Sequence, residues 1–170
     1  MRQITLITTG GTIEKTYDEQ SGSLENRRSI VGRMLTRLRL EDTKITTIEL
    51  MSKDSLFMTD DDRARLVASV REASIASPRP DGIVVLHGTD TLTQSGERLL
   101  KELSPLPLPV VLTGAMRPFE MKRSDALQNL TESIFAAGFL SPGVYCVAHG
   151  RALAFPGIVK DREKGTFRKV

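Results

Sequence analysis

The sequence predicts an α/β protein with a doubly wound, mostly parallel sheet. Short apolar runs alternate with segments that carry apolar residues at helical spacing, and three of the apolar runs end in polar, glycine-containing strings. Continuous apolar strands separated by amphipathic helices are typical of a parallel sheet covered on both faces. We expect five strands in the flavodoxin-like order 2-1-3-4-5, with right-handed crossovers and a C-terminal hairpin or arm.

In the first half of the chain, the ranges 3–9 and 44–50 are predicted strands, and the range 30–40 is a predicted helix. The ranges 10–29 and 51–58 are expected to be loops. Thr59 then begins a helix, because its hydroxyl can cap the first turn and the acids of the range 60–62 complement the helix dipole. We interpret these acids as a helix start rather than a metal site. The buried face of this helix is predicted to be Leu66, Val67, Val70 and Ala73.

In the second half, the ranges 83–86, 110–113 and 143–148 are predicted strands. Two helices separate them, and the second begins at Ser124 and Asp125. The inner face of the first helix is predicted to be Leu92, Leu99, Leu100 and Leu103. The inner face of the second is predicted to be Leu127, Leu130, Ile134 and Phe135. The polar range 149–170 is expected to form the hairpin or arm.

The composition fits one domain over residues 1–170 with an aliphatic core, since 39% of the residues are hydrophobic and only 5% are aromatic. The net charge is +3 and the pI about 9.2. We expect no nucleic-acid partner, because the basic residues are interleaved with acids. The single cysteine, Cys146, excludes an internal disulfide and is expected to be a buried, inert thiol. No signal peptide or membrane-spanning run is visible, so a cytoplasmic enzyme without a membrane partner is expected.

The three polar strings are Thr-Thr-Gly-Gly-Thr at 8–12, His-Gly-Thr-Asp-Thr at 87–91 and Thr-Gly-Ala-Met-Arg-Pro at 113–118. Ligands of open α/β sheets bind at the carboxyl ends of the strands, so the strings are expected to meet at one crevice. Neither a dinucleotide fingerprint nor a phosphate-binding loop is present. Hydroxyls, a carboxylate and bare glycine backbone favour acyl-group chemistry. Each string also has a plain interpretation: a turn, a helix cap at Asp90 and Thr91, a packed His87, and a surface ion pair at Arg117.

Taken together, the strings in this order and spacing resemble the bacterial-type L-asparaginases. The resemblance covers nearly the whole chain and implies a single catalytic domain of the asparaginase N-terminal type over 1–170, a short form without the second domain of most relatives. It implies an amidohydrolase that cleaves the side-chain amide of L-asparagine to aspartate and ammonia through a threonine nucleophile and an acyl-enzyme. It implies no cofactor.

The resemblance also implies roles for individual residues. Thr12 matches the nucleophile, while Thr89, Asp90 and Lys160 match the second hydroxyl with its carboxylate and lysine. Tyr17 is the candidate for the lid tyrosine of the family, although it follows Thr12 more closely than is usual there. Ser52 matches a residue that binds the substrate α-carboxylate, and Lys53 stands where many relatives have glutamine. The substrate-binding residues implied are Gly11, Ser52, Lys53, Gly88 and Ala115.

The chemistry itself is coherent. A threonine hydroxyl is a weak nucleophile and needs a positioned base, and a lysine can serve if its charged form is disfavoured or its proton is relayed through a hydroxyl. Backbone N–H groups around Gly11 and Thr89 are candidate oxyanion donors. The carboxylate of Asp90 can hold a substrate ammonium. The range 13–26 is long, polar and contains Gly22, as expected of a lid, with Glu25 and Asn26 as further lid candidates.

Other functions stay open at this point. The chain could be a glutaminase, the ammonia-producing module of a tRNA amidotransferase, a non-catalytic amino-acid sensor or a flavodoxin-like nucleotide binder. No metal site is predicted, because neither His87 nor His149 has a partner at ligand spacing. The expected partner is a small-molecule amino-acid amide, and a homodimer or homotetramer is expected by analogy.

Overall fold

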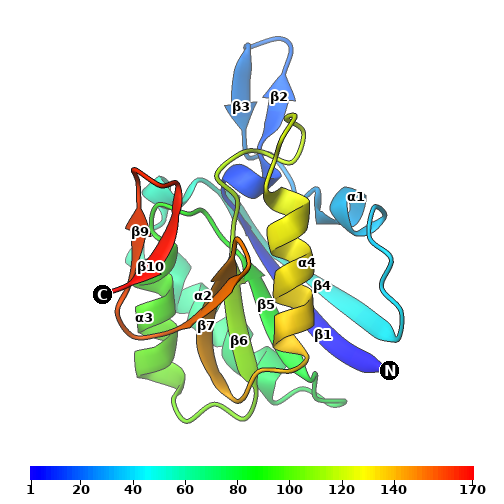
Figure 1. The fold of residues 1–170 in the computed structure, drawn as a ribbon, viewed down its shortest axis with the longest axis vertical. Coiled ribbons are helices and arrows are strands. Elements are labelled where there is room, and N and C mark those ends of the chain that lie inside the picture. The colour runs from blue at the N-terminus through cyan, green and yellow to red at the C-terminus, as the bar shows by residue number, and fades with distance from the viewer.

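The computed structural model describes residues 1–170, and its centre is a six-stranded sheet of order β4-β1-β5-β6-β7-β8 (Figure 1). The strands are β4 (Thr43–Lys53), β1 (Arg2–Gly10), β5 (Gly82–Leu86), β6 (Pro109–Thr113), β7 (Gly143–Ala148) and β8 (Arg151–Ala154). The first five pair in parallel. The predicted order 2-1-3-4-5 is confirmed.

The prediction of five strands is wrong by one, because β8 adds an antiparallel edge strand to β7. A two-residue turn joins them, and both of its residues have positive φ, 54° at His149 and 76° at Gly150. Such turns match the twist of paired strands and are typical of tight hairpins. The strand escapes prediction because the range 151–154 is short and lacks a buried apolar run.

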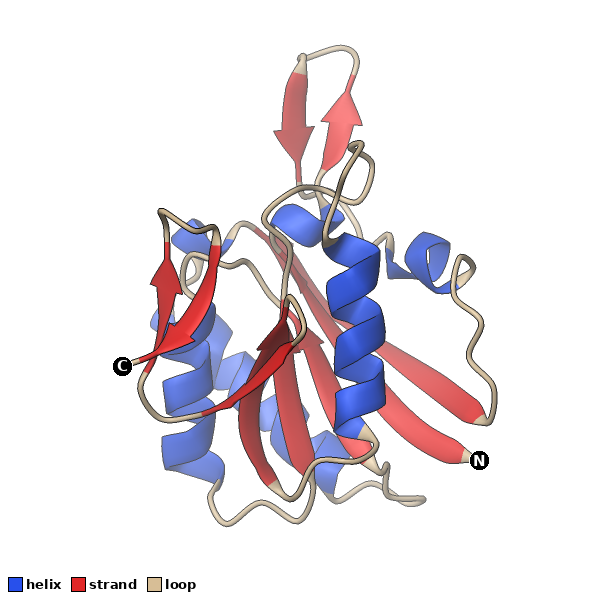
Figure 2. Cartoon of the chain, viewed as in Figure 1, coloured by secondary structure: helices blue, strands red, loops and turns tan.

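Helices cover both faces of the sheet (Figure 2). On one face lie α2 (Asp60–Ser74) and α3 (Leu92–Leu103), and on the other lie α1 (Val31–Leu35) and α4 (Ala126–Ala137). Every residue of β5 and β6 is buried between these layers. Each fully buried aliphatic side chain stabilises the fold by about 1.5–3 kcal/mol. The doubly wound architecture predicted from the alternation of apolar strands and helices is confirmed.

Helix α2 begins as the sequence predicts. The hydroxyl of Thr59 accepts from the N–H of Asp62, whose carboxylate accepts from the N–H of Thr59 in return. This reciprocal cap satisfies two backbone donors that the helix cannot satisfy itself. The carboxylate of Asp62 also forms an ion pair with Nζ of Lys53 at 2.7 Å, which joins the cap to the end of β4.

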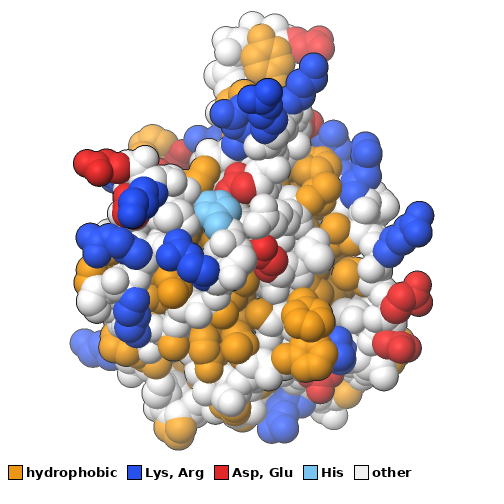
Figure 3. Space-filling model, viewed as in Figure 1, with side chains coloured by type: hydrophobic (Ala, Val, Ile, Leu, Met, Phe, Trp, Pro, Cys, Tyr) orange, Lys and Arg blue, Asp and Glu red, His pale blue; other side chains and the backbone are white.

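Two helical predictions need correction. The helix expected over 30–40 is only the five-residue α1, which contains Gly32 and starts without a side-chain cap. Phe135, predicted to face inward, is 63% exposed, and its ring lies 4.6 Å from that of Phe139. These two rings account for exposed apolar surface at the lower end of α4 (Figure 3).

Two short hairpins lie outside the sheet, toward the carboxyl ends of its parallel strands (Figure 1). The first, β2 (Thr16–Asp18) with β3 (Ser23–Glu25), occupies the range expected to be a loop and projects from the body. Lys and Arg side chains gather where it meets the body (Figure 3). The second, β9 (Ile158–Asp161) with β10 (Thr166–Lys169), is the expected C-terminal hairpin. The single-turn helices η1 (Thr12–Glu14) and η2 (Ser55–Phe57) follow β1 and β4.

None of the helices has the length and apolar content required to cross a bilayer.

Candidate active site

The three polar strings meet at the carboxyl ends of β1, β5 and β6 through backbone-on-backbone contacts. Gly11 has φ +79°, and a Cβ built on it would lie 2.4 Å from the Cα of Gly88. A Cβ built on Gly114 would lie 2.3 Å from the carbonyl oxygen of His87 and 3.1 Å from the Cγ2 of Thr89. Only glycine permits such approaches. The expected convergence of the strings at one edge of the sheet is therefore observed.

Lys160 joins this edge from the C-terminal hairpin. Its Nζ lies 2.7 Å from Oγ1 of Thr89, 71 residues away, and 3.0 Å from Oδ1 of Asp90. Partial burial opposes ionisation of Asp90, but the hydrogen bonds and charges of Lys160 and Arg162 outweigh it and hold the pKa of the carboxyl below its usual range. A hydroxyl, a lysine and a carboxylate thus form one hydrogen-bonded set.

A second group of contacts fixes the hairpin that carries Lys160. His149 contacts Oγ1 of Thr166 through Nδ1 at 2.9 Å and Oδ2 of Asp125 through Nε2 at 2.7 Å. Arg151 also donates to Oγ1 of Thr166, at 3.0 Å. Phe167, which pairs with Lys160 in the hairpin register, is buried in the core. The position of the lysine is therefore set by polar contacts and by packing together.

Thr12 is the first residue of η1, directly after the glycine that contacts Gly88. Its hydroxyl makes no hydrogen bond within the chain, and its side chain is half-buried. Two residues further along the same short helix, the buried carboxylate of Glu14 accepts from the N–H groups of Gly10 and Ile30 at 3.2 Å and 3.1 Å. Burial raises the pKa of the Glu14 carboxyl above its ordinary value. Glu14 thereby ties the turn after β1 to the segment before α1.

The structure narrows the set of candidate oxyanion donors around Gly11 and Thr89. The N–H of Gly11 itself donates to the carbonyl of Lys53 at 2.8 Å, so it is not free to stabilise a developing charge. Thr12 opens a short helix, where the first N–H groups have no partner inside the helix. The N–H groups of Thr12 and Thr89 remain the candidates.

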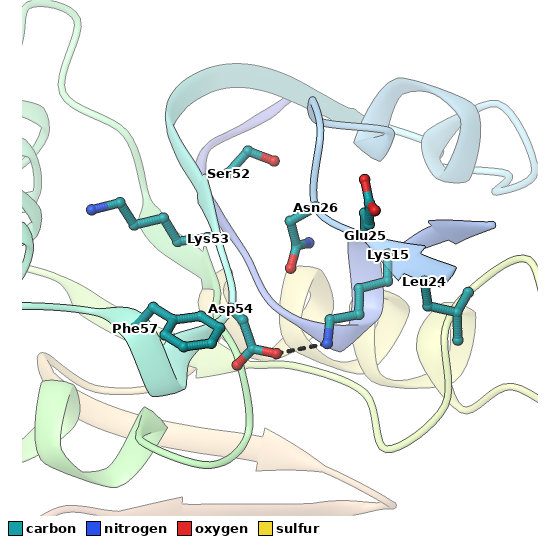
Figure 4. Close-up of a pocket in the computed structure, with 8 residues that line it drawn as sticks. All are labelled: Lys15, Leu24, Glu25, Asn26, Ser52, Lys53, Asp54 and Phe57. Atoms are coloured by element: carbon teal, nitrogen blue, oxygen red, sulfur yellow. Dashed lines mark hydrogen bonds and ion pairs between the residues drawn. The ribbon is translucent and has the colours of Figure 1, made fainter. Parts of the chain in front are cut away.

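A cavity of about 480 Å³ lies beside this edge (Figure 4). Its lining comes from the lid, the end of β4 and the segment through η2, and consists of Lys15, Leu24, Glu25, Asn26, Ser52, Lys53, Asp54 and Phe57. None of Thr89, Asp90 and Lys160 lines this cavity. Asp54, which does, accepts from Nζ of Lys15 at 2.6 Å and is close enough to Lys160 for the charge of that lysine to lower its pKa.

Two polar atoms of the cavity lining are buried without a hydrogen-bond partner. They are Oγ of Ser52 and Oδ1 of Asn26. The amide nitrogen of Asn26 donates to the carbonyl of Gly11 at 2.8 Å, which connects the lid to the residue before Thr12. Buried polar groups are almost always paired, so these two atoms are candidates to contact a polar ligand in the cavity.

The other predicted substrate-binding residues lie in different surroundings. Lys53 lines the cavity, but its ammonium is paired with Asp62 and does not simply point to solvent. Ala115 is buried beside Gly114, whose carbonyl accepts from Asn129 at 2.9 Å. Gly88 packs on Ser55, where an added Cβ would lie 2.5 Å from the serine side chain.

Tyr17 is not brought to the lysine set. It stands opposite Leu24 in the lid hairpin, is 59% exposed and lines a different cavity together with Met121 and Glu120. The residues of the lid that line the cavity beside the site are instead Lys15, Leu24, Glu25 and Asn26.

The remaining chemical side chains are structural. His87 is fully buried between the carbonyl of Gly88 and Oγ of Ser95, each at 2.8 Å, and burial lowers its pKa to about 4. Burial raises the pKa of the Cys146 thiol to about 12, which leaves it unreactive. No group of three or more His, Cys, Asp or Glu side chains is arranged to hold a metal ion.

Sequence reasoning missed Glu14, Lys15, Asp54 and Arg162. Glu14 carried a usable signal, since an acid two residues after the polar string falls in the first turn that follows the strand. Arg162, which lies 3.0 Å from Oδ1 of Asp90, carried none, because its neighbour is known only once the hairpin docks.

Comparison with known proteins places this arrangement in context. The family model described as "Asparaginase, N-terminal" matches residues 3–164. The L-asparaginase of Thermococcus kodakarensis is 32% identical over 143 residues, covering 84% of this chain and 43% of that protein. One component of the glutamyl-tRNA(Gln) amidotransferase of Pyrococcus abyssi is 31% identical over 149 residues, covering 87% of this chain and 34% of that protein.

The solved structure of the thermostable L-asparaginase from Thermococcus kodakarensis superposes with a TM-score of 0.87 at 29% identity. The superposition covers 99% of this chain and 51% of that chain. The chain thus spans less than half the length of the two curated relatives and about half of this solved chain.

Proposed function

The chain belongs to the asparaginase family, and from this premise we propose that it hydrolyses the side-chain amide of L-asparagine to aspartate and ammonia. The observation that carries the proposal is the contact of Lys160 with both Thr89 and Asp90 at the strand end that touches Gly11. A lysine held between a hydroxyl and a carboxylate can move a proton through that hydroxyl.

In the proposed reaction, the hydroxyl oxygen of Thr12 attacks the amide carbon, and its proton leaves with the amide nitrogen as ammonia. The set of Lys160 and Thr89 moves the proton, while Asp90 keeps the lysine in place. The acyl-enzyme is an ester of Thr12. Water, activated by the same set, then adds to the ester carbon, releases aspartate and restores the hydroxyl. The N–H groups of Thr12 and Thr89 stabilise the oxyanion, at about 3 kcal/mol for each donor.

Substrate binding follows from the charges around the site. Asp90 receives the α-ammonium, because its carboxylate is ionised and lies beside the reacting hydroxyls. The unpaired hydroxyl of Ser52 donates to the α-carboxylate, which gives this buried atom the partner it lacks. The orphaned carbonyl oxygen of Asn26 takes a donor of the substrate in the same way.

Two variants test the nucleophiles. Thr12→Ala and Thr89→Val are each expected to lower kcat for asparagine by about 10³-fold or more with an unchanged thermal unfolding midpoint. Thr131→Ala, on the outer face of α4, is the matched control and retains full activity. Ammonia release is measured with both asparagine and glutamine. Near-full hydrolysis by either site variant removes that residue from the mechanism.

An ammonia-producing amidotransferase module is the second candidate, favoured by the likeness to the amidotransferase component of Pyrococcus abyssi. The same assay separates the two, since a preference for glutamine over asparagine supports the module or a glutaminase. Tight binding of asparagine without any ammonia release would instead identify a non-catalytic sensor.

A further inference from the structure

The carboxylate of Asp90 holds two cations on one oxygen. Nζ of Lys160 and Nη1 of Arg162 each lie 3.0 Å from Oδ1 of Asp90. The two cations differ in their surroundings. The Lys160 side chain is 16% exposed and also bonded to Thr89, whereas the Arg162 side chain is 69% exposed and pairs with Asp90 alone.

This arrangement places more positive than negative charge at the carboxylate of Asp90, where a substrate ammonium would bind. One carboxylate charge faces two cations, so an ammonium that reaches Asp90 is the third cation on the same group. Like charges at hydrogen-bonding distances repel, and the repulsion is weakened but not removed by solvent. An amide substrate without the ammonium meets no such repulsion.

We propose that Arg162 is a specificity-determining residue that disfavours amides carrying a free α-ammonium relative to amides of the same shape that lack it. The proposal rests on the proposed function, in which Asp90 receives the ammonium. Arg162 competes with the substrate for one carboxylate oxygen and must swing aside before asparagine binds fully. The discrimination is therefore set at the rim of the site by a solvated side chain rather than by the reacting groups.

The structure separates this role from a purely structural one. The hairpin that carries Arg162 is held by His149, Arg151 and the buried Phe167, and none of these side chains forms a hydrogen bond or ion pair with Arg162. Loss of Arg162 therefore leaves the hairpin docked. Loss of Arg162 strengthens the attraction of Asp90 for Lys160, and this changes kcat for every substrate by the same factor. It also frees Asp90 for an ammonium, and this changes the binding only of substrates that carry one.

The test compares Arg162→Gln with the matched control Arg168→Gln. Arg168 lies on the same hairpin, is similarly exposed at 54% and pairs with Asp161 instead of Asp90. Each protein is assayed with L-asparagine and with succinamate, which has the same carboxylate and amide but no ammonium. Arg162→Gln is expected to raise the ratio of kcat/KM for asparagine over succinamate by about two- to fivefold, mainly through KM. The control leaves the ratio unchanged.

Salt provides a second readout. The difference in that ratio between wild type and Arg162→Gln narrows at high ionic strength, because screening weakens a repulsion between exposed charges. A ratio that stays constant or falls in Arg162→Gln overturns the proposal, as does an equal rise in Arg168→Gln, which would indicate a general field effect.

Failure of the proposed function is recognised separately. If wild type releases ammonia from neither amide, the hydrolase assignment fails, and the affinities for aspartate and succinate measured by calorimetry then decide the role of Arg162. A rise in the preference for aspartate in Arg162→Gln supports the proposal, and an unchanged preference refutes it.

Discussion

Gly11 and Gly88 meet backbone to backbone, closely enough that a Cβ on Gly11 would stand 2.4 Å from both the Cα and the nitrogen of Gly88. This contact joins the strand end that carries Thr12 to the strand end that carries Thr89. In the proposed mechanism, this contact is what brings the hydroxyls of these two residues to one substrate molecule.

Gly11→Ala is expected to destabilise the fold by about 2–4 kcal/mol and to abolish measurable activity, because a methyl group meets backbone that cannot yield. Gly150→Ala is the matched control, since its φ of +76° is close to the +79° of Gly11 but nothing lies within 4 Å of the added Cβ. It is expected to cost about 1 kcal/mol. Chemical denaturation and ammonia release measure both variants, and equal losses would contradict the packing argument.

Lys160→Met is expected to lower kcat by about 10²–10⁴-fold while the fold is retained, because the methionine keeps the apolar stem but removes the group that moves the proton. Lys164→Met changes an exposed lysine in the turn of the same hairpin and leaves kcat unchanged. Steady-state kinetics and circular dichroism provide the comparison. An active Lys160→Met protein would show that another group is the base.

His149→Ala is expected to lower kcat about tenfold, because the bridge between Thr166 and Asp125 is lost and the hairpin of Lys160 loosens. His149→Gln has the same backbone cost at positive φ but can both donate and accept, so it should recover most of the activity. Unfolding free energies accompany the kinetics. If alanine and glutamine behave alike, the bridge does not position the lysine.

Acid should weaken the fold through His87. Burial lowers the pKa of His87 from 6.5 to about 4, so the unfolded chain binds more protons than the folded chain between these pH values. This contribution to stability is fully present above pH 6.5 and is lost as the pH falls toward 4, at a slope of at most about 1.4 kcal/mol for each pH unit. Urea unfolding at several pH values gives the unfolding free energy as a function of pH, and this free energy should fall less steeply with acid for His87→Gln than for wild type. Identical slopes would exclude this histidine as the source.

The layers and the strand order could be predicted because they depend on local patterns. The apolar runs of β5 and β6 are continuous, and the capping box of Thr59 and Asp62 spans only four residues, so both can be recognised in the sequence. The edge strand β8 could not be predicted because its exposed or half-buried residues carry no periodic signal, and only the turn of His149 and Gly150 marks it.

At the site, the polar strings could be read from the sequence and Lys160 from the family resemblance, but Lys15, Asp54 and Arg162 could not. Asp54 meets Lys15 and Asp90 meets Arg162 only because two hairpins dock onto the end of the sheet. The lid shows the limit clearly. Tyr17 is the candidate that the family resemblance implies, whereas the hairpin brings Leu24, its cross-strand partner, to the cavity beside the site.

The close contacts of Gly11, Gly88 and Gly114 also restrict where the sequence of this fold can change. Where main chain rests on main chain, no side chain can be exchanged, so mutation has nothing to vary there. Any change in the shape of the cavity must therefore come from the positions whose side chains line it, which lie in the lid and in the segment 52–57.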